Sequence, residues 1–312
     1  MDNVTKVAAL FAGQGAQYPG MGRSLYDGSA AARAVFAMAD DVFSGTSERC
    51  FTGSDETLRN TLFTQTCVCA VDLACAAALD EAGVGAQGAA GFSLGEMAAL
   101  AYAGLLSQRE AFALTAERAR LMQLCTRGED GAMVAVLRLD AESVRDLCRR
   151  FSGLYPANYN CPGQTVVAGE RTELEKLAAR VAQKGGRTVA LAVGGAFHSP
   201  YMARAADGLR EHVRAYRFSP PRIPLYANAT AAPYDAESAA ALIAAQVESP
   251  VLWEATIRRM ATDGFDTFVE MGPGRVLSGL VKKIIPGARI CNVEDMESLR
   301  ETVRELKGER VC

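Results

Sequence analysis

Short apolar runs alternate along the chain with longer helical segments rich in Ala and Leu. Runs of about five apolar residues predict strands, and apolar positions three and four residues apart predict helices. The expected helices cover residues 66–82, 94–103 and 108–125. The expected strands are 7–12, a short one ending near 91, 223–227, 267–270 and 289–292. This alternation is typical of an α/β protein with a mainly parallel sheet.

The middle of the chain has a pattern of its own, which predicts a second, smaller sheet. Its strands are expected at 133–137, 165–168 and 188–193, and its helices at 141–151 and 170–183. Glycines at both ends provide flexible connections. We therefore expect a discontinuous large α/β domain, residues 1–127 and 199–312, with a small domain inserted at 128–198.

Composition excludes several classes of protein. The length of 312 residues, with 49% hydrophobic and 22% charged residues, predicts a globular chain of about two domains. The net charge of −3 argues against nucleic acid as a partner. The most apolar run, 66–79, is short for a membrane span and contains Asp72. The first residues lack the features of a secretion signal, so we expect a cytoplasmic protein that binds no membrane.

Cysteine and histidine are placed unfavourably for a metal site. The nine cysteines are scattered, no Cys-x-x-Cys occurs, and the chain has only two histidines. The cysteines are therefore interpreted as small core residues in a reducing compartment. We expect no metal.

The sharpest local signal is Gly-Phe-Ser-Leu-Gly-Glu at residues 91–96. A Gly-x-Ser-x-Gly between a strand and a helix forms a tight turn that exposes the serine oxygen. The following helix directs its free N–H groups at that point, where an oxyanion would develop. Because Ser93 and Glu96 also fit a helix capping box, the segment alone leaves nucleophile and cap both open.

A serine nucleophile needs a base, and only two histidines are available. His212 lies among charged residues of an expected helix, which predicts a solvated surface position. His198 follows an expected strand, and α/β proteins place their sites in the loops at strand ends. Although a lone loop histidine is more often structural, His198 is the favoured partner of Ser93.

A second glycine-containing loop, Gly-Gln-Gly-Ala-Gln at residues 13–17, follows the first strand. A dinucleotide fingerprint would need glycine where Tyr18 stands, so we discount NAD. Such a loop can instead present backbone N–H groups to an anion, or it can be a simple turn.

Arg118 falls in the middle of the apolar stripe of the helix expected at 108–125. A charge on a buried face must be paired or must await an anionic ligand. The planar guanidinium suits a carboxylate. A structural ion pair and a ligand clamp both remain open.

Together these segments resemble the malonyl-CoA:acyl-carrier-protein transacylase family, which includes the acyltransferase domains of polyketide synthases. The matching segments run in family order over residues 10–285, nearly the whole chain. They are residues 13–17, 91–96, 118–123, 158–164, 195–200 and 270–274.

The resemblance implies a hydrolase-like large domain with a ferredoxin-like small domain. It also implies that Ser93 is the nucleophile and His198 its general base. A backbone carbonyl near Gln246 would orient the imidazole.

The family's remaining site positions also have counterparts here. The backbone N–H groups of Gln14 and Leu94 would form the oxyanion hole, and Arg118 would bind the free carboxylate of a malonyl group. Asn158 and Asn160 match family positions near the cleft.

The implied reaction moves malonyl from coenzyme A to the phosphopantetheine thiol of acyl carrier protein, through a malonyl-serine ester. The coenzyme A thioester and the carrier-bound phosphopantetheine are substrates, so no cofactor is needed, and we expect a monomer. Such a carrier is acidic and should meet a basic patch. The pairs at residues 149–150, 258–259 and 282–283 are candidates, although such pairs are usually just solvated surface.

The chain departs from the family at Phe92, where a histidine usually precedes the nucleophile. That histidine lines the acyl pocket, so Phe92 is either a neutral change of the wall or the sign of a different acyl group.

Three other functions compete with malonyl transfer in fatty acid synthesis. A free-standing acyltransferase for polyketide carriers would use the same catalytic residues. A simple esterase normally has an acidic triad member and an apolar acyl tunnel. Arg118 and the loop at residues 13–17 argue against an esterase. A non-catalytic carrier-binding protein would bind the carrier and form no acyl-enzyme.

Overall fold

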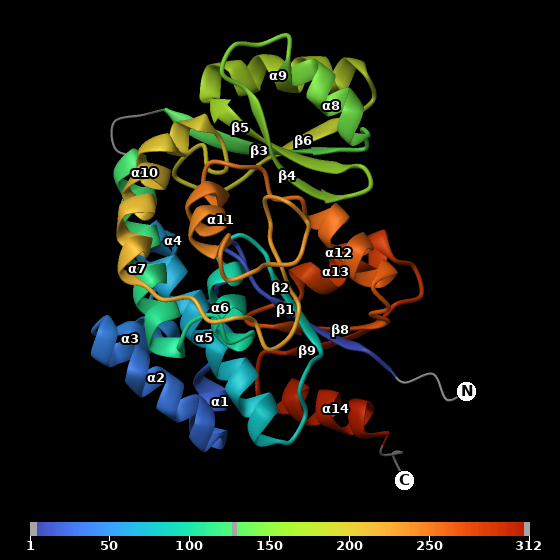
Figure 1. The fold of residues 1–312 in the computed structure, drawn as a ribbon. Coiled ribbons are helices and arrows are strands. Elements are labelled where there is room, and N and C mark those ends of the chain that lie inside the picture. Colours follow the sequence, from blue (N-terminus) through green and yellow to red (C-terminus); the bar gives the residue numbers. More distant parts are fainter. Residues whose placement is uncertain (1–4, 127–129, 309–312) are drawn as a thin grey trace.

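The computed structural model describes residues 5–126 and 130–308, and it contains two sheets (Figure 1). The larger sheet is entirely parallel, with strand order β7-β2-β1-β8-β9. Its strands are β1 (Val7–Phe11), β2 (Gly88–Gly91), β7 (Leu225–Tyr226), β8 (Thr267–Met271) and β9 (Arg289–Val293). Because all five run the same way, the loops after them meet at one edge of the sheet.

Helices cover both faces of this sheet, as the alternation of its side chains requires. Ala9 and Phe11 of β1 pack into a core with α5 (Thr61–Glu81), α6 (Gly95–Tyr102) and α7 (Gln108–Cys125). Ala8 and Leu10 point the other way, toward α12 (Trp253–Thr262) and α13 (Val276–Ile284).

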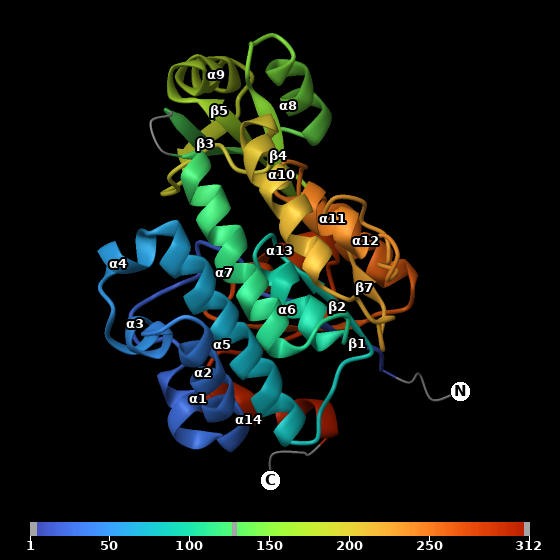
Figure 2. The same cartoon turned by 60° about the vertical axis from the view of Figure 1, so that its left-hand side comes forward.

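The remaining helices of the large part surround this framework (Figures 1 and 2). They are α1 (Arg23–Gly28), α2 (Ala30–Val42), α3 (Thr46–Thr52), α4 (Asp55–Arg59), α10 (Ala203–His212), α11 (Ala239–Gln246) and α14 (Met296–Lys307). In Figure 2, α7 and α10 lie side by side and lead up to the smaller sheet.

The central helix α5 differs from the expected 66–82 because it begins at Thr61 and so reaches 21 residues. An 18-residue window of this helix has a mean hydropathy of 1.7, so by length and composition alone the helix could cross a membrane, whereas the sequence pattern gave a run too short to do so. However, 83% of that window is buried inside the protein, including Asp72 and Cys75. Burial all round is the property of a core helix.

The smaller sheet is antiparallel, with strand order β4-β5-β3-β6. Its elements follow one another as β3 (Gly131–Leu137), α8 (Ala141–Cys148), β4 (Tyr155–Cys161), β5 (Gln164–Glu170), α9 (Arg171–Gln183) and β6 (Arg187–Ala190). This is the ferredoxin-like β-α-β-β-α-β arrangement. The fold class expected from the sequence is confirmed.

The two faces of the smaller sheet have different partners. Val136 and Val167 pack under α8 and α9. Met133, Ala135 and Val166 face the core of the larger part. The smaller sheet therefore covers the edge of the larger part at which the parallel strands end.

The pattern did not predict β4, and it overestimated the strand at 223–227, of which only Leu225–Tyr226 is formed. The expected boundary at 127/128 lies outside the described residues, and the division into 1–127 with 199–312 and 128–198 remains a prediction.

Candidate active site

Ser93 stands at the sharp turn between β2 and α6, with a left-handed φ of 51°. Gly91 and Gly95 allow the turn because the chain folds closely on itself there. A Cβ on Gly91 would lie 2.0 Å from the carbonyl carbon of Gly95, and one on Gly95 would lie 2.2 Å from the oxygen of Phe11. The two glycines let α6 begin directly over the end of β1, with Ser93 held at the sheet edge.

His198 lies within hydrogen-bond distance of Ser93, with 2.6 Å between Nε2 and Oγ. Its Nδ1 is 3.0 Å from the carbonyl oxygen of Gln246 and 3.2 Å from that of Ser249. Since a carbonyl can only accept, Nδ1 carries the proton and Nε2 is free to accept one from Ser93. Burial, and then the charge of Arg118, lower the pKa of His198 to about 4, which keeps the imidazole neutral.

Asn228 supports the turn from the end of β7. Its Oδ1 accepts from the backbone N–H of Ser93 at 2.7 Å, and its Nδ2 donates to the oxygen of Gly91 at 2.6 Å. Its own N–H donates to Glu96, which also accepts from the hydroxyl of Tyr234. Burial raises the pKa of Glu96 to about 7. Sequence reasoning missed Asn228 and Tyr234, although Asn228 follows an expected strand end.

Arg118 of α7 is buried, and its hydrogen-bond partners are all uncharged. Two of its nitrogens donate to Oε1 of Gln246, Nε at 3.3 Å and Nη2 at 2.8 Å. Nη1 donates to Oε1 of Gln65 at 2.5 Å. Nη2 also lies 3.2 Å from Oγ of Ser93. Burial lowers its pKa to about 10, so it stays cationic at neutral pH. No ion pair within residues 5–126 and 130–308 includes this guanidinium.

Gln65 is a site residue that the sequence reasoning missed. It lies one residue before the helix start that the pattern predicted, and its partner Arg118 is 53 residues away along the chain, so no local signal marked it. Gln246 has a second role beyond its carbonyl. Its Nε2 donates to the backbone oxygen of Ser93 at 2.7 Å, which connects the arginine, the histidine and the serine through one side chain.

The expected oxyanion-hole residues flank the serine. Leu94 precedes the first residue of α6, where helix N–H groups lack intrahelical partners. Gln14 follows β1 and lines the same cavity as Ser93. Among the described residues, no hydrogen bond occupies the N–H of Gln14 or of Leu94.

These groups open into a cavity of about 230 Å³ between the two sheets. The larger part contributes Gln14, Phe92, Ser93, Arg118, His198, Val276 and Leu280, and the smaller sheet contributes Met133, Ala135, Asn158, Asn160 and Val166. A larger hollow of about 560 Å³, between α5 and α14, contains none of the expected site residues.

The cavity wall includes an aromatic side chain, Phe92, and a polar side chain with an unpartnered oxygen, Asn160. Phe92 packs edge-on against Trp253, with ring centres 5.3 Å apart. Asn160 is buried, and its Oδ1 has no hydrogen-bond partner among the described residues. No cluster of three His, Cys, Asp or Glu side chains suited to a metal occurs in the described part of the chain.

Comparisons with known proteins agree with this geometry. Residues 9–308 match the model of the acyl transferase domain. The malonyl CoA-acyl carrier protein transacylase of Bacillus subtilis is 35% identical over 315 residues, which cover 98% of this chain and 99% of that protein. A crystal structure of the enzyme of that name from Clostridium perfringens has a TM-score of 0.94 at 35% identity, covering 97% of this chain and 98% of that one.

A further solved structure contains a type II polyketide synthase acyl-carrier protein in complex with its malonyl-transacylase. It has a TM-score of 0.93 at 31% identity and covers 96% of this chain and 100% of that one. The likeness thus extends over both sheets and the cavity between them. On these grounds, the chain belongs to the malonyl-CoA:acyl-carrier-protein transacylase family of acyl transferases.

Proposed function

We propose that this chain transfers a malonyl group from coenzyme A to the phosphopantetheine thiol of acyl carrier protein, in support of fatty acid synthesis. The observation that carries the proposal is the buried, unpaired guanidinium of Arg118, 3.2 Å from the serine oxygen that His198 activates. The neutral acyl group of an ordinary ester has no charge that could pair with this guanidinium, whereas a malonyl group ends in a carboxylate that can.

In the first half of the reaction, His198 Nε2 takes the proton of Ser93 as Oγ attacks the thioester carbonyl. The N–H groups of Gln14 and Leu94 stabilise the negative charge that develops on the carbonyl oxygen. The carbon–sulfur bond then breaks, and His198 returns the proton so that coenzyme A leaves as a thiol. Malonyl remains as an ester on Ser93.

In the second half, His198 takes the proton of the carrier's thiol, and the thiolate attacks the malonyl ester. The tetrahedral intermediate collapses, the new thioester leaves, and Ser93 recovers its proton. Arg118 holds the malonyl carboxylate throughout, while Phe92, Asn158 and Asn160 form the walls around the acyl group. Exclusion of water preserves the ester between the two halves.

The decisive experiment is intact mass after brief incubation with malonyl-CoA and no acceptor, with Ser93→Ala as the control. We expect a malonyl adduct on the unaltered protein alone. An adduct from another acyl-CoA, with none from malonyl-CoA, would assign Phe92 to a changed acyl pocket. If the folded protein forms no adduct with any donor, the proposal that it is an enzyme is overturned, and a non-catalytic carrier-binding protein is favoured.

A second candidate is the loading of polyketide carriers, which the 31% identical malonyl-transacylase in complex with its polyketide carrier favours. The same residues would act in it. Comparison of discharge rates with a fatty acid carrier and a polyketide carrier separates the two pathways. Under either function, we expect the protein to be a cytoplasmic monomer.

A further inference from the structure

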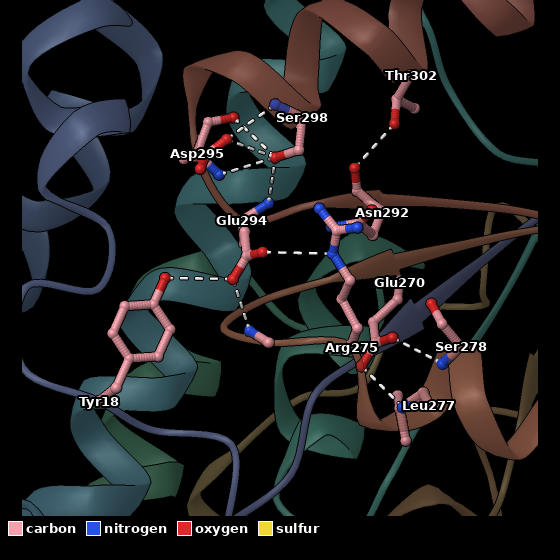
Figure 3. A network of polar contacts seen from close by, with 11 residues as sticks. Tyr18, Glu270, Arg275, Leu277, Ser278, Asn292, Glu294, Asp295, Ser298 and Thr302 are labelled. Carbon is pink, nitrogen blue, oxygen red and sulfur yellow. Dashed lines mark hydrogen bonds and ion pairs between the residues drawn. The ribbon is translucent and has the colours of Figure 1, made fainter.

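The loop that carries Gln14 is held by hydrogen bonds at its two ends. At the first end, the backbone N–H of Ala12 donates to the carbonyl oxygen of Met271 at 3.0 Å. At the second end, the hydroxyl of Tyr18 donates to Glu294 at 3.2 Å (Figure 3). In the described part of the chain, no backbone–backbone hydrogen bond joins the residues between these two anchors to another segment. The position of the Gln14 N–H is therefore set by packing.

A small hollow of about 100 Å³ lies against this loop and leaves it room to shift. Residues 12–16 line one part of the hollow, and Glu270, Val276 and Leu277 line another. The second part is fixed, because the carboxylate of Glu270 accepts N–H groups from the first turn of α13. The donors are Leu277 at 2.8 Å and Ser278 at 2.7 Å (Figure 3). A loop beside such a hollow keeps one position only if another group supports it.

The side chain of Phe92 is the group in contact with the loop. It lines both the small hollow and the cavity around Ser93, so it stands at the boundary of the two. A Cβ on Gly13 would lie 2.9 Å from Cδ1 of Phe92, which places the ring directly against the loop. The ring also packs against Trp253, which is fully buried at the start of α12. Phe92 is thus held between a glycine of the loop and a fixed indole.

The backbone of Phe92 fixes the ring relative to the nucleophile. Its N–H donates to the carbonyl oxygen of Phe11 at the end of β1, at 3.0 Å. Its own carbonyl oxygen accepts from the N–H of Gly95 at the start of α6, also at 3.0 Å. Because Phe92 directly precedes Ser93 in the chain, the ring and the nucleophile are parts of one rigid turn. The contact of the ring with the loop therefore connects the position of Ser93 with that of Gln14.

We propose that the side chain of Phe92 is a positioning residue, which holds the loop so that the N–H of Gln14 stays at the place required of an oxyanion donor. This inference rests on the proposed function. Such a donor acts only at hydrogen-bond distance from the oxygen of the transition state, so a shift of about 1 Å weakens it strongly. The ring then serves a step that is common to every acyl group, beyond its place in the cavity wall.

Three variants of Phe92 and one control separate this role from packing in general. Phe92→Ala removes the ring, and Phe92→Leu keeps apolar bulk without a planar ring. Phe92→His keeps a planar ring, with an atom in the place of Cδ1. The control is Phe36→Leu in α2, because the ring of Phe36 also lies against a glycine, with a Cβ on Gly22 2.7 Å from its Cζ. Phe36 lines neither the cavity nor the small hollow.

Each protein is loaded with malonyl-CoA or acetyl-CoA, labelled with carbon-13 at the thioester carbonyl. The readouts are the maximal loading rate and the infrared stretching frequency of the acyl-serine carbonyl, which a hydrogen bond from Gln14 lowers. We expect Phe92→Ala and Phe92→Leu to raise this frequency and to reduce the loading rate about tenfold, by the same factor for both donors. Phe92→His should retain both values, and Phe36→Leu should change neither.

An unchanged carbonyl frequency in Phe92→Ala overturns the proposal, even if the loading rate falls. A change confined to KM or to the ratio of the two donors also overturns it, because Phe92 would then act only as part of the wall around the acyl group. A raised frequency in Phe92→His counts against the proposal as well, since that variant retains a ring. If the unaltered protein forms no ester with either donor, the proposed function fails instead.

Discussion

At the scale of single residues, Arg118 shows how a buried charge can be held without being neutralised. Its neighbours Gln65 and Gln246 present amide oxygens, which accept hydrogen bonds and bring no negative charge. Glu96, whose charge acts on Arg118, has its two oxygens committed to the N–H of Asn228 and the hydroxyl of Tyr234. A carboxylate at either glutamine position would pair with the guanidinium permanently and compete with the substrate.

Replacement of Arg118 by Ala should therefore reduce selection of malonyl-CoA over acetyl-CoA. Hydrogen bonds to a charged group are worth about 1.5–3 kcal/mol, so the ratio of the two kcat/KM values should fall roughly 10- to 100-fold. The measurement is the rate of adduct formation with each donor. Because acetyl has no carboxylate, its rate is the internal control. An unchanged ratio would contradict the clamp.

The pH dependence of loading should reflect the unusual state of His198. A base must be neutral to accept the proton of Ser93, and His198 is neutral above its pKa of about 4. With acetyl-CoA as donor, the loading rate should stay flat from neutral pH until the pH approaches that value. Arg118→Ala removes a cation that lowers this pKa, so the acid limb should move to higher pH.

A control is needed for Glu96, whose pKa of about 7 lies inside the same range. Any change near pH 7 that disappears in Glu96→Gln belongs to that carboxyl. If the acid limb of Arg118→Ala stays where it is in the unaltered protein, Arg118 does not act on His198 in the manner described.

At the scale of elements, the site depends on how closely α6 approaches the sheet. The strand–turn–helix unit β2–Ser93–α6 works because Gly95 lies against the backbone oxygen of Phe11 in β1. Side chains on both faces of β1 are buried, so neither the strand nor the helix can shift without disturbing a packed core.

Gly95→Ala should consequently destabilise the protein by about 2 kcal/mol or more, since overpacking against fixed backbone is costly. Gly279→Ala in α13 is the matched control. Its added methyl meets open space, and loss of a helical glycine should stabilise by about 0.5–1 kcal/mol. Urea unfolding of both variants measures the two changes. Equal stability of the two variants would refute the close-approach argument.

Prediction from sequence succeeded for elements with strong local signals. Helix α7 occupies the expected 108–125, because Ser107 and Glu110 form a capping box at its start and its apolar stripe is regular. The strand β4 was not predicted, because its Pro156, Asn158 and Asn160 are disfavoured in strands. It forms at the edge of the sheet, with register shifts against β5, where tertiary packing overrides propensity.

The same limit applies to the site. The expected partners Ser93 and His198 were identifiable, since a motif and a count of two histidines single them out. Gln65 and Asn228 were not, because their contribution is a contact across more than 50 residues of chain. Motifs report local geometry, whereas these contacts depend on how distant elements pack.

At the scale of the whole molecule, the cavity belongs to both sheets. Met133 and Asn158 come from the small antiparallel sheet, whereas Ser93 comes from the turn after β2 of the parallel sheet and Arg118 from α7. A ligand in the cavity contacts both parts at once. Binding should hence stabilise the two parts together against unfolding.

Thermal unfolding of Ser93→Ala, which can bind malonyl-CoA without reacting, tests this linkage. At a ligand concentration 100 times Kd the gain is about 2.7 kcal/mol, which should raise Tm by several degrees. Ser93→Ala with Arg118→Ala should show a much smaller rise at the same concentration. A rise confined to one of several unfolding transitions would indicate that the ligand stabilises one part only.

The left-handed backbone at the reacting pair has a consequence for the evolution of this fold. Ser93 has φ 51° and His198 has φ 56°, conformations that cost a residue with a side chain about 1–3 kcal/mol each. Glycine would relieve that strain at both positions and would abolish the chemistry. The two positions that the proposed reaction requires are thus positions at which the backbone alone favours glycine, so selection for stability alone would work against the proposed activity there.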